Sequence, residues 1–465
     1  MADAQAKFLT GNLFRHVSVM SLTSSVGLMA IFAVDFIDMI FIAMLGKAEL
    51  AAAVGYAATI LFFTTSFGIG MAIAAGALVA RALGAGDAQL AQERRTHALV
   101  YGVTFGIAFS GLVWWWLEEI VFLLGATGET AYLAVLYLTI VVPSLPFLMV
   151  GMMGGAILRA HGDAKRAMMA TIYGGLVNAI LDPILIFGLD LELVGAALAS
   201  VAARVVIALT ALLPIINHYG GIQRPRLTGM VRDLPPIAAI AFPAILTQLA
   251  TPVGQAIVTR AMAEFGEMAI AGMAIVGRLS PLAFGVIFAL SGAVGPILGQ
   301  NFGARNFDRV RVGLQSALLF TGIVIVVVSA VLFALRGPIA DLFQATGVTR
   351  ELVFLFCGPL SLLFFFNGVL FVSNAAFNNL GHPFYSTFLN WGRNTVGMIP
   401  LVLLGSATLG AQGVLIGQAL AGVIFGVLAW LLARRVIAKA PEEIDKAPSE
   451  FGRQGRLMSL FYLRR

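Results

Sequence analysis

The first long apolar stretch of the chain, residues 17–46, reads VSVMSLTSSVGLMAIFAVDFIDMIFIAMLG. As a helix it is long enough to cross the roughly 30 Å hydrocarbon core of a bilayer. Two acids, Asp35 and Asp38, interrupt it, and a carboxylate near the bilayer centre costs about 2.5–3.5 kcal/mol on the most lenient scale. We therefore expect these acids to bind an ion, relay a proton or pair with a buried partner.

The composition excludes a soluble protein. Hydrophobic residues make up 60% of the 465 residues and charged residues only 11%, whereas soluble domains average about 25% charged residues. The net charge of +6 is spread over short loops, so it predicts contact with membrane lipid and not with nucleic acid. Cys357 is the only cysteine, which excludes an intrachain disulfide. We expect a monomer.

Apolar runs of membrane-spanning length recur twelve times along the chain. We predict spans at residues 15–45, 50–80, 97–117, 131–159, 167–188, 194–218, 237–263, 268–299, 312–335, 352–378, 384–408 and 412–435. If both termini lie on one side, the loops on that side carry most of the arginines, including Arg94, Arg95, Arg226 and Arg305. The excess of positive charge predicts cytoplasmic termini in a cell inner membrane.

The two halves of the chain repeat each other. Residues 83–85 (LGA) match residues 302–304 (FGA), and Gly162 matches Gly381, with the same offset along the chain in both matches. Six spans in each half make the halves parallel, related by a pseudo-two-fold axis along the membrane normal. The fold class is therefore an all-α polytopic membrane protein with two six-helix lobes. The predicted parts are a cytoplasmic N-terminus (1–14), an N-lobe (15–219), a cytoplasmic linker (220–236), a C-lobe (237–438) and a cytoplasmic tail (439–465), whose end could lie on the membrane surface.

The fifth span carries the second group of polar residues, in the sequence NAILDP from Asn178 to Pro183. Asn178 and Asp182 are four residues apart, so they share one helical face. Pro183 has no backbone N–H, which frees the carbonyl of Ala179 beside them. These oxygens suit a proton or a small cation; the alternative is a buried acid that only bonds the broken backbone.

The two acids of the first span are one turn apart, so both can face the lobe interior. Like charges in one poorly solvated cavity favour a shared proton. We rank Asp38 and Asp182 first as ion-coupling acids and Asp35 second, because Asp35 could instead face an open cleft.

Four segments resemble motifs of the multidrug and toxic compound extrusion (MATE) transporters. They are DMIFIAMLG at residues 38–46, LRAHGD at 158–163, NAILDPILIFG at 178–188 and GQNFG at 299–303. The resemblance covers about residues 12–438. It implies twelve spans in two lobes and efflux of bulky, often cationic compounds driven by inward H⁺ or Na⁺.

The resemblance also implies site residues. Asp38, Asn178 and Asp182 match the polar N-lobe cluster of the bacterial DinF-like branch, and Ser200 stands where that branch has a threonine. The acids that the NorM branch places in its C-lobe are replaced here by Gln255 and Asn367. We therefore expect ion coupling in the N-lobe.

Polar residues in the C-lobe spans are candidates for a substrate cavity. Asn367 and Asn374 recur at helical spacing, and they could line the cavity or make hydrogen bonds between helices. Arg278 and Arg393 could contact an anionic substrate or lipid, or pair with polar side chains such as Asn390. Together with Gln255 these residues form the predicted substrate cavity.

The function that the sequence predicts is secondary antiport, not enzymatic catalysis. The carrier would export bulky, mostly cationic or lipophilic drug-like compounds in exchange for inward H⁺ or Na⁺ by alternating access, without a cofactor or resident metal. One alternative is a flippase of lipid-linked precursors from the same superfamily, which would need a cationic cavity. Another is a polytopic lipid-modifying enzyme, which would need a cluster of acid–base or metal-binding residues at a membrane face.

Overall fold

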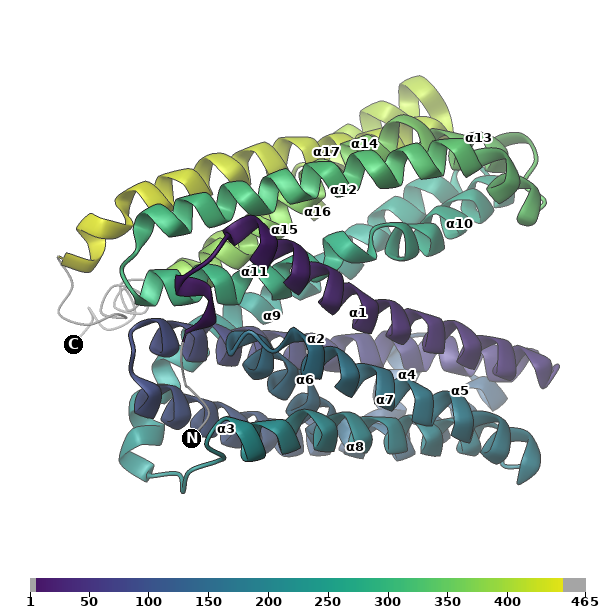
Figure 1. Ribbon diagram of the computed structural model, residues 1–465. Coiled ribbons are helices and arrows are strands. Elements are labelled where there is room, and N and C mark those ends of the chain that lie inside the picture. The colour runs from purple at the N-terminus through teal and green to yellow at the C-terminus, as the bar shows by residue number, and fades with distance from the viewer. Residues whose placement is uncertain (1–5, 446–465) are drawn as a thin grey trace, which may run out of the picture. The chain divides into compact units, whose positions relative to one another are not determined.

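The computed structural model describes residues 6–445, and every regular element in that range is a helix (Figure 1). The predicted tail (439–465) falls largely outside this range, since only residues 439–445, the end of the last helix, are described. The first half of the chain contains a 3₁₀ turn η1 (Lys7–Leu9), α1 (Leu13–Met44), α2 (Ala48–Gly84), α3 (Ala88–Trp115), α4 (Leu117–Leu123), α5 (Gly128–Val141), a 3₁₀ turn η2 (Val142–Ser144), α6 (Leu145–Ala160), α7 (Ala164–Pro183), a π-helical turn η3 (Ile184–Gly188) and α8 (Glu192–His218).

The second half repeats this plan. It contains α9 (Leu227–Ala263), α10 (Glu267–Ala283), α11 (Gly285–Gly303), α12 (Phe307–Leu342), α13 (Gly347–Leu355), a π-helical turn η4 (Phe356–Leu360), α14 (Ser361–Leu363), α15 (Phe365–Leu380), α16 (Pro383–Asn394) and α17 (Met398–Asp445). The pairs α2 and α10, α3 and α12, α5 and α13, and α7 and α16 all begin at one constant offset along the chain, the offset that separates Gly162 from Gly381. The helices thus follow the repeat that the sequence predicts.

The number of spans agrees with the prediction. Ten helices of the described range are long and apolar enough to cross a membrane, or eleven if the pair Gly347–Leu363 and Phe365–Leu380, bent by 45°, is one span. The last of them, Pro383–Glu442, has 60 residues, enough for two crossings. It is broken at Gly410, whose φ of 60° and ψ of −140° are open to glycine but not to other residues. Two crossings there bring the total to twelve.

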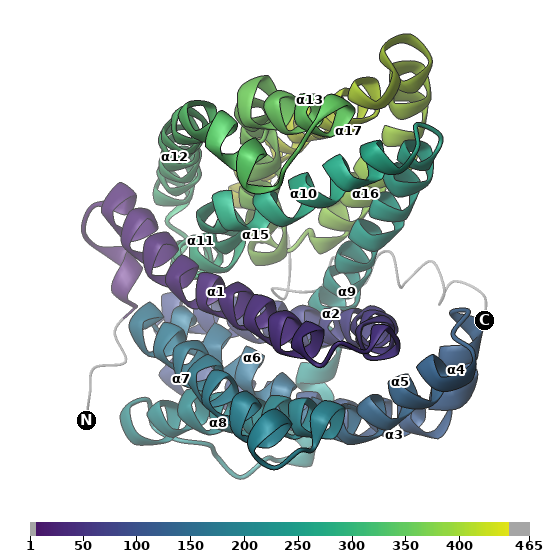
Figure 2. The same cartoon turned by 90° about the vertical axis from the view of Figure 1, so that its right-hand side faces the viewer.

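Several predicted spans are broken. The sequence predicts one continuous span over residues 268–299, but α10 ends and α11 begins on either side of Phe284 (Figure 2). The span over 352–378 contains the non-helical Gly358, and the span over 384–408 is interrupted at Thr395, the residue that ends α16. Proline explains the break at Gly358, because Pro359 directly follows it and cannot donate a backbone hydrogen bond to the preceding turn.

By their internal contacts the residues form two compact units. The first unit comprises Val26–Ala241 and the second comprises Lys7–Ser25 together with the chain from Phe242 onward. The boundaries fall inside α1 and α9, whereas the sequence predicts lobe boundaries in the loops at residues 15, 219 and 237. The start of each half is therefore tied to the other half of the chain.

Hydrogen bonds of the second unit hold the N-terminal segment. Phe8 is 1% exposed; its backbone N–H donates to Gln300 Oε1 at 2.8 Å, and its carbonyl accepts from Arg309 Nη2 at 3.0 Å. Arg309 also donates to the carbonyls of Thr10 and Gly11. Four backbone groups of this segment are thus satisfied by side chains of α11 and α12, which is why it groups with them.

Candidate functional site

Three polar side chains meet inside the first unit, where α1 and α7 come together. Asn178 of α7 donates from Nδ2 to Asp38 Oδ1 of α1 at 2.9 Å and to Asp182 Oδ2 at 2.8 Å. Asn178 is 4% exposed and Asp182 1%. One amide therefore bridges two carboxyl groups from different helices. We call Asp38, Asn178 and Asp182 the acid pocket.

The two carboxyl groups of the acid pocket also interact directly. Asp38 and Asp182 lie within hydrogen-bonding reach of each other. Two ionised carboxylates are acceptors only, so such a bond requires a proton on one of them. Asp182 Oδ1 is buried and receives no donor from the described residues, and no arginine in that range pairs with either acid. The acid pocket thus contains two carboxyl groups that share one amide donor, and no arginine of the described range is paired with either of them.

The backbone next to the acid pocket is irregular. Pro183 is the last residue of α7, and the helix continues as the π-helical turn η3. Because Pro183 has no N–H, the carbonyl of Ala179 loses its usual donor, one turn from Asp182. Single π-turns inside helices are often found at functional sites. The structure therefore places a weakened helix segment directly against the pocket.

Residues of α5 and α8 border the same pocket. Ser200 of α8 is hydrogen-bonded to Tyr137 of α5, and Tyr137 in turn interacts electrostatically with Asp38, Asp182 and Arg204. Arg204 donates from Nη1 to the carbonyl of Val141 at 3.2 Å and to Ser144 Oγ at 3.0 Å. This arginine is held by neutral acceptors of the η2 break. Tyr137 thus interacts with both the acids and Arg204.

Asp35 does not join the acid pocket. Its side chain is exposed, and within residues 6–445 it makes no hydrogen bond, although its charge acts on that of Asp38. Of the five predicted ion-coupling residues, the structure brings Asp38, Asn178 and Asp182 into direct contact. It places Ser200 at their border through Tyr137, which the sequence analysis did not identify. No local pattern marks a tyrosine on α5 as a neighbour of acids on α1 and α7.

The predicted substrate-cavity residues of the second unit differ in burial. Gln255 and Arg278 are exposed. Asn367 is 9% and Asn374 7% exposed; Asn374 Oδ1 accepts from Asn390 Nδ2 at 3.2 Å, whereas Asn367 Oδ1 is buried and has no partner in the described range. Arg393 lies half-buried near the end of α16. The structure thus connects Asn374 of α15 with Asn390 of α16 and leaves Gln255 and Arg278 exposed.

A comparison with protein-family models matches the family described as MatE over residues 24–184 and 243–404. The two matched stretches begin at the same offset as the paired helices and together cover more than half of the chain. The protein belongs to the MatE family. This membership confirms the resemblance to MATE transporters that the sequence motifs carry.

Named relatives of this MatE protein are transporters. A "FAD transporter" of Shewanella oneidensis is 28% identical over 435 residues, 92% of this chain and 96% of the relative. The "Multidrug export protein MepA" of Staphylococcus aureus is 24% identical over 454 residues, 96% of this chain and 100% of the relative. A solved structure described as the outward-facing conformation of a multidrug resistance MATE family transporter is 22% identical, with a TM-score of 0.88 over 95% of this chain and 100% of that chain. This MatE protein is a membrane transporter and not an enzyme, and its fold is that of the solved MATE structures.

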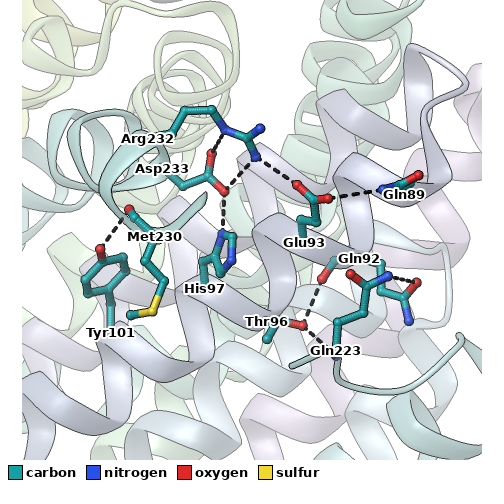
Figure 3. A network of polar contacts seen from close by, with 10 residues as sticks. All are labelled: Gln89, Gln92, Glu93, Thr96, His97, Tyr101, Gln223, Met230, Arg232 and Asp233. Carbon is teal, nitrogen blue, oxygen red and sulfur yellow. Dashed lines mark hydrogen bonds and ion pairs between the residues drawn. The ribbon is translucent and has the colours of Figure 1, made fainter. Parts of the chain in front are cut away.

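A second polar network fixes the linker of this MatE protein to its first unit. Figure 3 shows Asp233 of α9 between His97 of α3 and Arg232. His97 Nδ1 and Asp233 Oδ2 are 2.6 Å apart, and both side chains are almost fully buried. Arg232 also donates to Glu93 Oε2 at 2.9 Å, and Tyr101 donates to the carbonyl of Met230 at 2.8 Å. The start of α9 therefore belongs with α3. The residues of this network are too far apart along the chain for a sequence pattern to reveal it.

The LRAHGD segment contacts the same linker. His161 stacks on Tyr219 with ring centroids 4.4 Å apart. Burial, reinforced by Arg95, lowers the pKa of His161 to about 3. Burial and a hydrogen bond to Asp163 raise the pKa of Tyr219 to about 12. Burial opposes ionisation of Asp163, but hydrogen bonds from Tyr219 and Arg166 outweigh it and hold the pKa of Asp163 below its usual value. This contact between the LRAHGD segment and the linker is thus built for a neutral histidine and an ionised aspartate.

Proposed function

We propose that this protein is a secondary antiporter that exports small organic molecules in exchange for a cation, H⁺ or Na⁺, bound in the acid pocket. The observation that carries the proposal is the contact of Asp38, Asn178 and Asp182, with the two acids on different helices and no arginine of the described range paired to either. Burying two ionised carboxylates together is unfavourable, so a positive ion between them stabilises the pocket.

Of the two coupling ions, the proton agrees better with the contacts in the pocket. The Asn178 amide already donates to one oxygen of each acid. A proton on Asp38 or Asp182 adds a hydrogen bond between the two acids and leaves the bonds from Asn178 unchanged. A hard metal cation instead takes several oxygen ligands at once. The proton therefore needs no rearrangement of the amide. Sodium would require Asn178 to turn its oxygen toward the acids.

Loading the pocket would change the preferred conformation of the carrier. Neutralising Asp38 or Asp182 removes the repulsion between α1 and α7, and the π-helical turn after Pro183 lets α7 adjust. A carrier alternates access when such a change favours one opening over the other. One charge moving inward is worth about 2.3 kcal/mol per 100 mV. This sustains roughly a 50-fold gradient of a neutral solute, since about 1.4 kcal/mol is one decade.

The cargo is the finer part of the proposal. The sequence predicts bulky cationic or lipophilic compounds, and the name of the multidrug export protein supports such a cargo. The name of the FAD transporter supports an organic anion instead. We also propose that the protein works in the cell inner membrane with both termini cytoplasmic, which the arginine-rich loops support.

The test is transport in vesicles that contain the purified protein, with a pH gradient and a sodium gradient imposed separately. We expect the pH gradient to drive export of a dye or flavin and the sodium gradient to have little effect. Drive by sodium alone would assign the pocket to Na⁺. Transport that ignores both gradients would exclude antiport by this protein.

A further inference from the structure

Arg393 occupies an unusual position in the second unit. It is the eleventh residue of α16, which begins at Pro383, and α16 ends at the next residue, Asn394. At 1.5 Å per residue it lies roughly 15 Å from the start of that helix, about half of the hydrocarbon thickness. In transporters, helices that break near the midplane commonly form the substrate site.

The orientation of α16 is fixed by contacts on two sides. Toward α9, Thr387 donates to the carbonyl of Pro243 and Trp391 donates to the carbonyl of Leu246, both at 2.8 Å. Toward α15, Ser386 contacts Asn378 at 3.5 Å and Asn390 contacts Asn374 at 3.2 Å. These contacts determine which side of α16 each remaining residue occupies.

Arg393 lies on the side that faces α15. At about 100° per residue it is within about 20° of Ser386 and about 60° of Asn390 around the helix axis. Ser386 contacts Asn378 and Asn390 contacts Asn374, so α15 and α16 run antiparallel at this point. One turn further along α16, the same register places Arg393 level with Phe371. One turn further along α15 is Asn367, whose Oδ1 is buried without a partner in the described range. The arginine thus lies one turn beyond the contact of Asn390 with Asn374, on the same side of α16.

Arg393 has no partner among the residues that the structure describes. Within residues 6–445 it makes neither an ion pair nor a hydrogen bond. The described acids of the second unit all lie in loops or near helix ends: Glu264, Glu267, Asp308, Asp341, Glu351, Glu442, Glu443 and Asp445. An unpaired arginine at this depth costs about as much as a carboxylate, and such residues mark substrate pathways by default.

The contrast with Arg204 shows what the protein does with a structural arginine. Arg204 donates to the carbonyl of Val141 and to Ser144 Oγ, and it is bound to the first unit by these acceptors. Arg393 has no such acceptors among the described residues, so packing within its own unit does not account for its charge.

We infer that Arg393 binds the phosphate of an anionic cargo, an organic phosphate that also carries a flat ring system. This inference rests on the proposed export function and names its substrate class. The guanidinium group matches a phosphate with two parallel hydrogen bonds, and the asparagine amides add neutral donors. Phe371, level with Arg393, lies against Phe288 with ring centroids 5.5 Å apart, which provides an apolar surface for the ring.

An anionic cargo changes how the membrane potential acts on the exchange. One proton inward and one monocation outward move no net charge, whereas one proton inward and one dianion outward move three charges in the favourable direction. The rate of export of a dianion should therefore rise with an inside-negative potential when the pH gradient is held at zero. Export of a monocation by the same carrier should not.

The test compares three flavins that share one ring system: riboflavin without phosphate, FMN with one phosphate and FAD with two. In vesicles we expect the wild type to transport FMN and FAD at least about tenfold faster than riboflavin. Arg393→Gln should lower FMN and FAD transport by about tenfold or more and leave riboflavin unchanged, and Arg393→Lys should recover part of the loss. Arg260→Gln, which removes an exposed arginine of α9, is the matched control and should behave as wild type.

Binding measurements separate this inference from the coupling proposal. Quenching of flavin fluorescence by the detergent-solubilised protein requires no ion gradient. Loss of FMN and FAD binding in Arg393→Gln, with a monodisperse elution profile, supports the inference even if no gradient drives transport. Wild-type FMN binding in Arg393→Gln, or an equal loss for riboflavin and a lipophilic cation, would overturn it.

Discussion

The two units of this transporter share one helical plan but differ in the polar residues inside their spans. At the offset of the repeat, Asp38, Asn178 and Asp182 of the first unit correspond to Ile257, Gly397 and Leu401 of the second. Conversely, Arg393 corresponds to Gly174. The repeat has therefore kept the apolar pattern that specifies the helices and changed the polar residues between the units. By our proposals, the first unit binds a cation and the second an anion.

The Gly174 and Arg393 pair shows how packing allows this difference. A Cβ on Gly174 would lie 2.2 Å from Ile207 Cγ1, so that position of the first unit is closed by α8. In the second unit the same position of the repeat carries a full arginine side chain. The difference lies in the neighbouring helix and not in the backbone plan.

The largest effect is expected from the acids. Asp38→Asn and Asp182→Asn should each lower gradient-driven export by more than about tenfold, a loss of about 1.4 kcal/mol or more, because an amide cannot bind and release a proton. Initial rates in vesicles measure this. Glu119→Gln, which alters an exposed acid of α4, should have no effect. Wild-type rates in both pocket variants would show that Asp38 and Asp182 do not couple export to the ion gradient.

A smaller effect is expected at the repeat position of Gly174. Gly174→Ala should destabilise the protein by about 1–3 kcal/mol, because the added methyl group overlaps Ile207. Its melting temperature in detergent should fall. Gly111→Ala is the control, since a Cβ there meets nothing within 4 Å and should be neutral or slightly stabilising. Equal melting temperatures for the two variants would mean that the position is as open in the first unit as in the second.

The smallest effect concerns pH and the linker contact of the first unit. The pKa of His161 is lowered to about 3 in the folded protein, against about 6.5 when unfolded. Its contribution to stability is therefore complete above pH 6.5 and is lost as the pH falls toward 3, by up to about 1.4 kcal/mol at about pH 5.5. His161→Gln should melt with a smaller difference between about pH 7.5 and about pH 5.5. An unchanged difference would show that His161 is not the titrating group.

The sequence predicted the spans and the repeat because long apolar runs and a fixed offset are local, additive signals. It did not predict the breaks at Phe284 and Thr395, because a span that bends keeps the same hydropathy. It placed Asn178 and Asp182 together correctly from helical spacing. It ranked Asp35 second among the coupling acids, with a position facing an open cleft as the alternative, and the structure exposes that side chain. Spacing on one helix does not determine which of these two positions is occupied.

Contacts between distant segments were the other part that the sequence could not provide. Tyr137 reaches the acid pocket from α5, and His97 of α3 meets Asp233 of α9. Neither pair has a spacing that a helix or a motif would show. The boundary of the units inside α1 and α9 has the same origin, since it depends on what Phe8 and Asp233 touch and not on where the loops lie.

The most direct test of ion binding by Asp38 and Asp182 is infrared difference spectroscopy of the purified protein during acidification. We predict that one protonated carboxyl band appears, that it is absent from Asp38→Asn and Asp182→Asn, and that Asp35→Asn and Arg393→Gln retain it. A wild-type spectrum without such a band throughout the pH range in which protons drive transport, or a band that survives both pocket substitutions, would contradict the account.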